Sequence, residues 1–390
     1  MDSSIMQNIY KFNNYLPNQY DYEKKFEVNH NYLTEQFSDH ELILEKIKNV
    51  VLNNDFTLGK EVDYLEEDFA NLIGVKYAIG VGSGTDALFL SLKSIGIEEG
   101  DEVITTPFTF YATIGAIVTA GAKPVFTDIC DDYNINVSEI EKKITSKTKA
   151  ILPVHWSGKP CNMDAIRGIA NKYNLTIVED ACHAILAKYK NKNAGNLGDV
   201  GCFSFHPLKN LNVWGDGGII TTNDPSVNHN LRLIRNHGLS GRNTCEIFSY
   251  NSRLDTIQAV VARHMLNKIE FITEKRIYNA HYLDKDLKNI SELKIPVREK
   301  HLTEVFHLYM FECERRDELK SFLNQNNIDA KIHYPVPMHL QPAAKSYGYK
   351  KGDFPKSEDL CLKVISLPVH EFITKENLNY MINKIQEFYK

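Results

Sequence analysis

The sequence of 390 residues lacks the features of several classes of protein. No apolar run reaches the ~18 residues that a membrane-spanning helix needs, and the N-terminus lacks the apolar core of a signal peptide. Its 45 basic residues are outnumbered by 50 acidic ones, and no block of Lys and Arg occurs. Nothing therefore indicates nucleic-acid binding. We expect a soluble, cytoplasmic protein with neither a membrane nor a nucleic acid as partner.

Signatures of metal and disulfide sites are also missing. The seven cysteines form no CxxC pair, and the 14 histidines form no HExxH motif. Cysteines in apolar, strand-like surroundings are typical of reduced buried thiols. We therefore expect no metal site.

What the sequence does have is a regular alternation of strand-like and helix-like runs. Continuous apolar runs occur at 76–83, 101–108, 123–129, 149–156 and 175–182, with helix-like runs between them. Strands that are apolar on both faces are typical of a parallel sheet wrapped by helices. The next two runs, 200–205 and 217–222, have no full helix between them, so an antiparallel strand can enter there. The pattern predicts an α/β fold with a mostly parallel, mixed sheet.

The pattern of apolar and polar residues changes after Arg253. Residues 253–289 contain no Pro or Gly and predict a long helix, broken at most once. Shorter pieces follow: a strand over 305–314, a helix over 316–327, a strand over 329–336 and a C-terminal amphipathic helix over 374–390. We place a polar N-terminal arm at 1–27, a large domain at 28–264 and a smaller α+β domain at 265–390.

The stretch "VGSGTDAL" (81–88) joins a strand to a helix through small residues. Gly82 and Gly84 allow a ligand to approach the backbone, and the first amides of the helix have no partner within it. The stretch is thus typical of a phosphate site, although a ligand-free tight turn has the same pattern. A dinucleotide site also stays open, but the third glycine of its fingerprint is replaced by Thr85.

Two further stretches carry charged residues where buried strands end. In "IVEDACHA" (177–184), strand alternation directs Glu179 and Asp180 to opposite sides. Asp180 could hold a proton on a basic ring nitrogen or could cap a helix. In "FSFHPLKNLNVWGDGG" (203–218), Lys209 follows a strand and a proline, five residues after Ser204. A lysine in a partly dry pocket has a depressed pKa and becomes a nucleophile.

Together the three stretches fit one cofactor, pyridoxal 5'-phosphate. Its phosphate needs helix amides and a hydroxyl, its pyridinium needs a carboxylate, and its aldehyde needs an amine.

The sequence resembles the DegT/DnrJ/EryC1 family of sugar aminotransferases, which have the fold-type I, aspartate aminotransferase-like architecture. The resemblance covers residues 28–390, and its motifs include "DFTLGKEVDYLEEDFANLIG", "GDEVITTPFTFYAT", "VEDACHA", "GDVGCFSFHPLKNL", "NSRLDTIQA" and "HYPVPMHLQPA". It implies a large cofactor-binding domain, a smaller C-terminal domain and a homodimer with shared active sites.

The resemblance also assigns site residues. Cofactor contacts are implied for Gly84, Thr85, Phe110, Asp180, His183, Ser204, Lys209 and Asn251. Lys209 would join the cofactor's aldehyde and later shuttle a proton, and Asp180 would hold the pyridine nitrogen protonated.

The remaining contacts follow the same resemblance. Phe110 would stack on the ring, and Asn251 would reach the phosphate in the partner subunit's site. Tyr334 and His339, in the stretch 333–343, would border the substrate.

Two positions depart from the family's usual pattern. His183 stands where most members have Gln, near the cofactor's phenolic oxygen, so its tautomer and charge bear on the chemistry. Trp214 stands at a small-residue position, where it could contact ligand or fill the core, with the core favoured.

The implied reaction moves an amino group from an amino acid, L-glutamate, to a nucleotide-linked keto-deoxysugar. The spacing in "KNLNVWGDGG" favours amination at C3, on a 3-keto-6-deoxyhexose, and amination at C4 of a 4-keto sugar is the alternative. A non-catalytic cofactor-binding regulator stays open as well. A dehydratase of the same fold would have His in place of Lys209, and a nicotinamide dehydrogenase would leave Lys209 and Asp180 unexplained.

Overall fold

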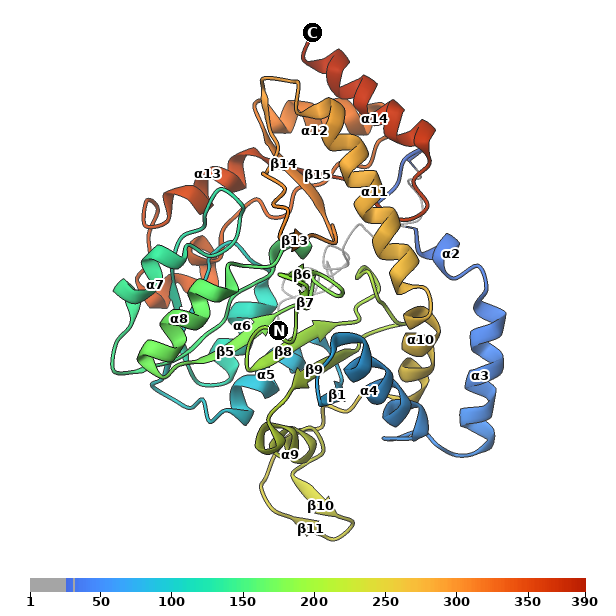
Figure 1. Cartoon of the computed structure of the whole chain (residues 1–390), viewed down its shortest axis with the longest axis vertical. Helices are drawn as coiled ribbons and strands as arrows, with labels where there is room; N and C mark the ends of the chain where they lie inside the picture. Colours follow the sequence, from blue (N-terminus) through green and yellow to red (C-terminus); the bar gives the residue numbers. More distant parts are fainter. Residues whose placement is uncertain (1–25, 31) are drawn as a thin grey trace, which may run out of the picture.

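The structure is a computed structural model that describes residues 26–30 and 32–390 (Figure 1). The predicted N-terminal arm therefore lies almost entirely outside the described residues. Within the described part of the chain, no helix is long and apolar enough to cross a membrane.

The centre of the molecule is a seven-stranded sheet in the order β1-β9-β8-β5-β4-β2-β3. Its strands are β1 Tyr77–Val81, β2 Glu102–Thr105, β3 Lys123–Phe126, β4 Thr148–Ile151, β5 Thr176–Asp180, β8 Val200–Ser204 and β9 Gly218–Thr222. Only β9 runs antiparallel to its neighbours, β1 and β8. The predicted α/β class and the antiparallel strand over 217–222 are confirmed.

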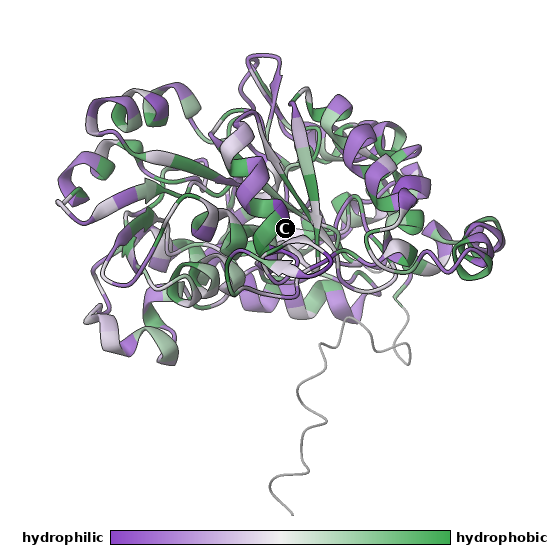
Figure 2. Ribbon diagram, turned by 90° about the horizontal axis from the view of Figure 1, so that it is seen from below, coloured by the Kyte–Doolittle hydropathy of each residue, from purple (hydrophilic) through white to green (hydrophobic). Residues whose placement is uncertain are grey.

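Helices cover both faces of this sheet. They are α4 Lys60–Ile73, α5 Gly84–Ser94, α6 Tyr111–Thr119, α7 Val137–Lys143, α8 Met163–Tyr173, α9 Pro225–Ile234 and α10 Thr256–Leu266, and α3 His40–Leu52 packs on the outside of α10. In β5, Val178 packs into the cluster with α5 and α6, whereas its neighbour Ile177 packs into the cluster with α7 and α8. Successive strand residues face opposite layers, which explains why these strands are apolar throughout. Figure 2 colours each residue of the ribbon by its hydropathy.

The C-terminal part has its own core around a three-stranded sheet, β12-β14-β15. Its elements are α11 Ile269–Leu287, β12 Leu293–Lys294, β14 Tyr309–Cys313, α12 Arg316–Gln325, α13 Pro355–Lys363, β15 Val364–Leu367 and α14 Lys375–Phe388. The predicted long helix is broken once, between α10 and α11. Val28 joins this core, and the domain limits at 28–264 and 265–390 stay a prediction.

The remaining elements of the described residues are short. They are α2 Leu33–Gln36, η3 Trp156–Gly158, β6 Lys188–Tyr189, β7 Lys192–Asn193, β10 Leu239–Gly241, β11 Thr244–Cys245, β13 Leu302–Thr303, η4 Met338–Leu340 and η5 Pro342–Tyr347.

One predicted strand is corrected by the structure, and another is shortened. Residues 329–336 form no strand, only an isolated bridge at Lys331, because Pro335 and Pro337 have no N–H for a ladder. The strand predicted over 305–314 begins only at Tyr309, and the preceding His307 and Leu308 instead line the pocket described below.

Candidate active site

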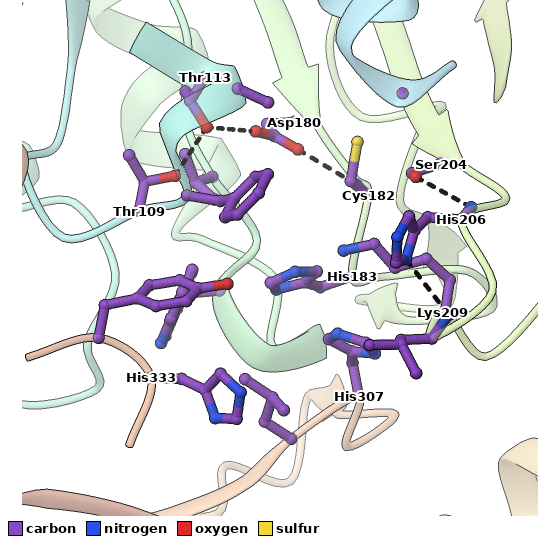
Figure 3. Close-up of a pocket in the computed structure, with 18 of the residues that line it drawn as sticks. Thr109, Thr113, Asp180, Cys182, His183, Ser204, His206, Lys209, His307 and His333 are labelled. Carbon is purple, nitrogen blue, oxygen red and sulfur yellow. Dashed lines mark hydrogen bonds between the residues drawn. The ribbon is translucent and has the colours of Figure 1, made fainter. Parts of the chain in front are cut away.

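A cavity of ≈ 440 Å³ opens at the carboxyl ends of β5 and β8, where the large sheet meets the C-terminal part of the chain (Figure 3). Ligands of open α/β sheets bind at this edge. The cavity is lined by eight of the predicted site residues, Gly84, Thr85, Phe110, Asp180, His183, Ser204, Lys209 and Tyr334.

One end of the cavity is built as an anion cradle. Ser83 caps α5 by accepting a hydrogen bond from the Asp86 amide, at 3.0 Å. No described residue accepts a hydrogen bond from the amides of Gly84 and Thr85, the first two of the helix. These amides and the positive end of the helix dipole suit a phosphate.

Gly84 is needed for this cradle because Ser204 lies directly against it. A Cβ at position 84 would lie 2.5 Å from the Ser204 Cβ and 2.8 Å from its Oγ. The Ser204 Oγ accepts a hydrogen bond from the His206 amide at 3.3 Å, which leaves its own proton available for a ligand.

Asp180 ends β5 and turns its carboxylate into the cavity (Figure 3). Its Oδ2 accepts a hydrogen bond from the Thr113 Oγ1 at 2.8 Å, and its Oδ1 accepts one from the Cys182 amide at 3.2 Å. No helix begins after β5, so the helix-cap alternative does not apply. Glu179 points to the other side of the sheet, as strand alternation predicts.

Lys209 follows Pro207 in a tight turn, in which its amide donates to the His206 carbonyl oxygen at 2.8 Å. Burial lowers the pKa of the Lys209 amine, and the nearby Asp180 carboxylate opposes that shift. A lowered pKa raises the fraction of neutral amine at ordinary pH, so Lys209 is chemically suited to attack an aldehyde.

His183 is a buried imidazole that lacks protein partners. Its Nδ1 is buried without a hydrogen bond, and no described residue bonds to either ring nitrogen. Burial, and then the positive charge of Lys209, hold the pKa of His183 well below its usual value, so the ring is neutral. Its ring lies between Trp156, at 5.2 Å, and His307, at 4.2 Å between centroids. An unpaired polar atom in such a place indicates a ligand contact.

Sequence reasoning missed Thr113 and His307. Thr113 lies in the first turn of the apolar helix α6, and His307 interrupts the apolar run 305–311. A lone polar residue in an otherwise apolar run was the available signal in both cases.

Two predicted residues are not brought to this cavity. His339 is buried elsewhere, where its Nε2 contacts the Glu358 carboxylate at 3.0 Å and its ring packs against Phe354. His339 therefore does not line this cavity, and its substrate contact stays a prediction. Asn251 is exposed, bridged to Asn236, and does not line the cavity.

Trp214 packs in the core, the role that the sequence analysis favoured. It packs against the cluster that includes α4 and α10, edge-on to Phe37.

These features fit pyridoxal 5'-phosphate. A helix cradle that a Cβ would fill suits its phosphate, Asp180 suits its ring nitrogen, Lys209 suits its aldehyde, and the unpaired His183 offers a polar contact beside them.

Comparison with known proteins gives a consistent assignment. The model of the DegT/DnrJ/EryC1/StrS aminotransferase family matches residues 38–386. A pleiotropic regulatory protein of Geobacillus stearothermophilus is 40% identical over 89% of this chain and 94% of its own. A dTDP-3-amino-3,4,6-trideoxy-alpha-D-glucose transaminase of Streptomyces venezuelae is 38% identical over 88% of this chain and 90% of its own.

Solved structures agree with this comparison. DesV of Streptomyces venezuelae superimposes with a TM-score of 0.91 at 35% identity, over 94% of this chain and 99% of that one. NtdA of Bacillus subtilis, solved with the cofactor PMP, superimposes with a TM-score of 0.87 at 27% identity, over 95% and 88%.

Proposed function

The chain belongs to the DegT/DnrJ/EryC1/StrS aminotransferase family, whose members are pyridoxal phosphate-dependent sugar aminotransferases, and from this premise we propose its reaction. The enzyme takes an amino group from an amino acid, L-glutamate, and transfers it to C3 of a nucleotide-linked keto-deoxysugar. The observation that carries this proposal is the convergence of the α5 cradle, Asp180 and Lys209 on one cavity.

When bound, the cofactor supplies an electron sink that makes a proton on the amine-bearing carbon removable. Lys209 is the group that takes this proton at its Nζ and returns it, because its lowered pKa leaves the amine able to accept one. Asp180 holds a proton on the ring nitrogen, and the Thr113 hydroxyl fixes the carboxylate for that task.

The other contacts follow from the cavity's walls. The Gly84 and Thr85 amides and the Ser204 hydroxyl hold the phosphate. Phe110 and Tyr334, whose ring centroids are 5.8 Å apart, form an aromatic wall that excludes water near the ring. Neutral His183 contacts the cofactor's phenolic oxygen, as donor or acceptor.

Amination at C3 is supported by "KNLNVWGDGG" and by the names of relatives. Besides the Streptomyces transaminase, a relative of Pseudomonas aeruginosa, 37% identical, is a UDP-2-acetamido-2-deoxy-3-oxo-D-glucuronate aminotransferase. Both names place the nitrogen or the oxo group at C3.

A homodimer completes the site in this proposal. Asn251 is exposed, and the segment before it presents Phe248, fully exposed, with Ile247 and Tyr250. Such an apolar edge suits burial against a second copy, which would bring the partner subunit's Asn251 to this phosphate cradle.

A panel of nucleotide sugars tests the proposed acceptor. The holoenzyme, loaded with nitrogen by L-glutamate, is offered 3-keto and 4-keto nucleotide sugars, and amine products are measured by mass spectrometry. Product from 3-keto sugars supports the proposal, and product only from 4-keto sugars replaces C3 by C4. Turnover of neither, with no response to glutamate, would favour a non-catalytic regulator, the role that the name of the Geobacillus relative suggests.

A further inference from the structure

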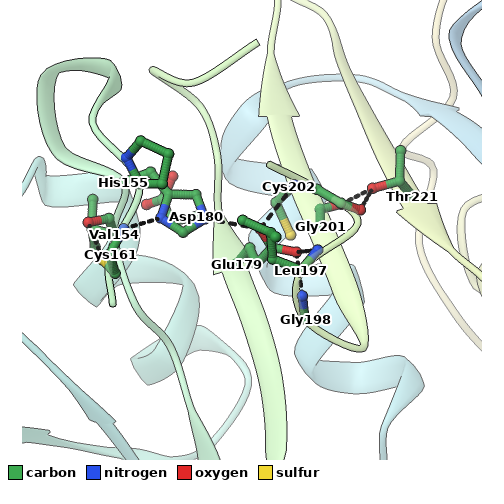
Figure 4. Close-up of polar contacts among 12 residues, drawn as sticks. Val154, His155, Cys161, Glu179, Asp180, Leu197, Gly198, Gly201, Cys202 and Thr221 are labelled. Atoms are coloured by element: carbon green, nitrogen blue, oxygen red, sulfur yellow. Dashed lines mark hydrogen bonds and ion pairs between the residues drawn. The ribbon is translucent and has the colours of Figure 1, made fainter. Parts of the chain in front are cut away.

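Glu179 precedes Asp180 in β5, points to the opposite face of the sheet (Figure 4) and does not line the cavity. Its side chain is fully buried. Both carboxylate oxygens accept two hydrogen bonds, all from N–H donors: His155 Nε2 at 2.8 Å and the amides of Gly195, Leu197 and Gly198 at 2.8, 2.8 and 2.5 Å. The carboxylate thereby ties the end of β5 to the loop before β8.

His155 completes the arrangement from the other side. Its ring is fully buried, and its Nδ1 accepts a hydrogen bond from the Cys161 amide at 3.2 Å. Because Nδ1 is an acceptor, the ring's proton is on Nε2 and is donated to Glu179. The backbone amide of His155 also donates to the Asp180 carbonyl oxygen at 3.0 Å, and the Asp180 amide donates to the Pro153 carbonyl oxygen at 2.9 Å.

We propose that Glu179 and His155 are a positioning pair that fixes the Asp180 carboxylate in the active site; this rests on the role proposed above for Asp180. A buried carboxylate is costly unless all its acceptor sites are filled, and an apolar residue would close the same space more cheaply. A buried acid that accepts from four N–H donors therefore indicates that the backbone must be held in one position here. The residue whose position it fixes is Asp180.

Glu179 affects the Asp180 carboxylate through the backbone of β5. The Asp180 side chain has two protein contacts of its own, Thr113 and Cys182. Cys182 belongs to the backbone that follows β5, whereas Thr113 lies in α6, so a shift of the end of β5 moves the carboxylate relative to the Thr113 hydroxyl. Displacements of about 1 Å in an active site can cost on the order of 10²-fold in rate.

The substitution Glu179→Gln isolates this effect. It keeps the shape of the side chain, but its NH₂ group must replace one acceptor oxygen. In either orientation that group faces a backbone N–H, Gly195 on one side or Leu197 and Gly198 on the other. A change of His155 tautomer would not help, since the Cys161 amide needs Nδ1 as its acceptor.

His155→Asn is a milder variant. Its side-chain oxygen can still accept from the Cys161 amide, while the donor to Glu179 is lost and the three backbone amides keep the carboxylate bonded.

The test is a pH titration of the bound cofactor's visible absorbance in the holoenzyme, together with kcat and KM for L-glutamate. We expect Glu179→Gln to lower kcat by about tenfold or more, with little change in KM. Its titration midpoint should move in the same direction as that of Asp180→Asn. His155→Asn should give the same shift to a smaller extent, and it keeps the proposal testable if Glu179→Gln fails to fold.

Glu66→Gln is the matched control. Glu66 is another buried glutamate, bonded to the Gly80 amide at 2.8 Å and to Arg235, and it does not line the cavity. It should lose stability but keep the midpoint and kcat. If Glu179→Gln and His155→Asn keep the wild-type midpoint and kcat, the positioning pair is overturned while the proposed function stands. If Asp180→Asn itself leaves the midpoint unchanged, the assigned role of Asp180 fails, and the inference fails with it.

Discussion

At the scale of single residues, some groups of the site can be predicted from the sequence around them, and others cannot. Lys209 and Asp180 could be predicted because each carries a charge where a buried strand has just ended. Thr113 and His307 could not be placed, because their roles depend on contacts with Asp180 and His183, more than 60 residues away in the chain. The contact of His339 with Glu358 could not be predicted for the same reason, since Glu358 lies in another helix.

Lys209→Ala should keep the cofactor in the phosphate cradle but lose transamination. Because Lys209 provides the proton transfer, kcat should fall by about 10²–10⁴-fold, as measured by coupled turnover and by cofactor content after dialysis. The control is Lys172→Ala, at an exposed lysine paired with Glu141. This variant should keep wild-type activity. Full turnover in Lys209→Ala would mean that another amine is the nucleophile.

The lowered pKa of Lys209 predicts a pH dependence. The neutral amine is the reactive form, so the rate at which apoenzyme joins added cofactor should rise with pH through a midpoint below 10.5, the ordinary lysine value. Since the Asp180 charge raises this pKa, Asp180→Asn should move the midpoint lower still. A stopped-flow absorbance series would measure both. A midpoint that moves up in the variant would contradict the assigned electrostatics.

At the scale of elements, continuous apolar runs predicted the strands of the large sheet, because burial on both faces is a property local to each strand's residues. The break between α10 and α11 was allowed for in advance. The absence of a strand over 329–336 was not predicted: Pro335 within the segment and Pro337 just after it have no N–H group for a ladder, while the apolar residues of the segment still resemble a strand.

Gly84→Ala tests the helix cradle. The added Cβ would meet Ser204 at 2.5 Å, so the start of α5 must move away and cofactor affinity should fall at least tenfold, measured by fluorescence titration of apoenzyme. Gly168→Ala, in the helix α8 with open space around it, is the matched control. It should leave affinity unchanged and stabilise the fold by about 0.5–1 kcal/mol. Equal cofactor affinity in the two variants would exclude α5 as the phosphate site.

At the scale of the whole molecule, the proposed homodimer depends on a surface that one chain leaves open. Phe248→Ser should raise the dimer dissociation constant, because the side chain is fully exposed in the single chain and apolar. Sedimentation velocity would measure the shift, with Val297→Ser, 75% exposed on another part of the chain, as control. A monomeric wild-type protein with full activity would contradict the shared site.

In the proposed reaction, a lysine-bound cofactor in this cavity accepts nitrogen from an amino acid. The most direct measurement is the visible absorbance of the purified holoenzyme before and after addition of L-glutamate, with the keto acid product assayed in the same sample. We predict that the absorbance band of the Lys209-bound cofactor bleaches as one equivalent of 2-oxoglutarate per site appears. A band that persists with glutamate and with every other amino acid tested would contradict the account.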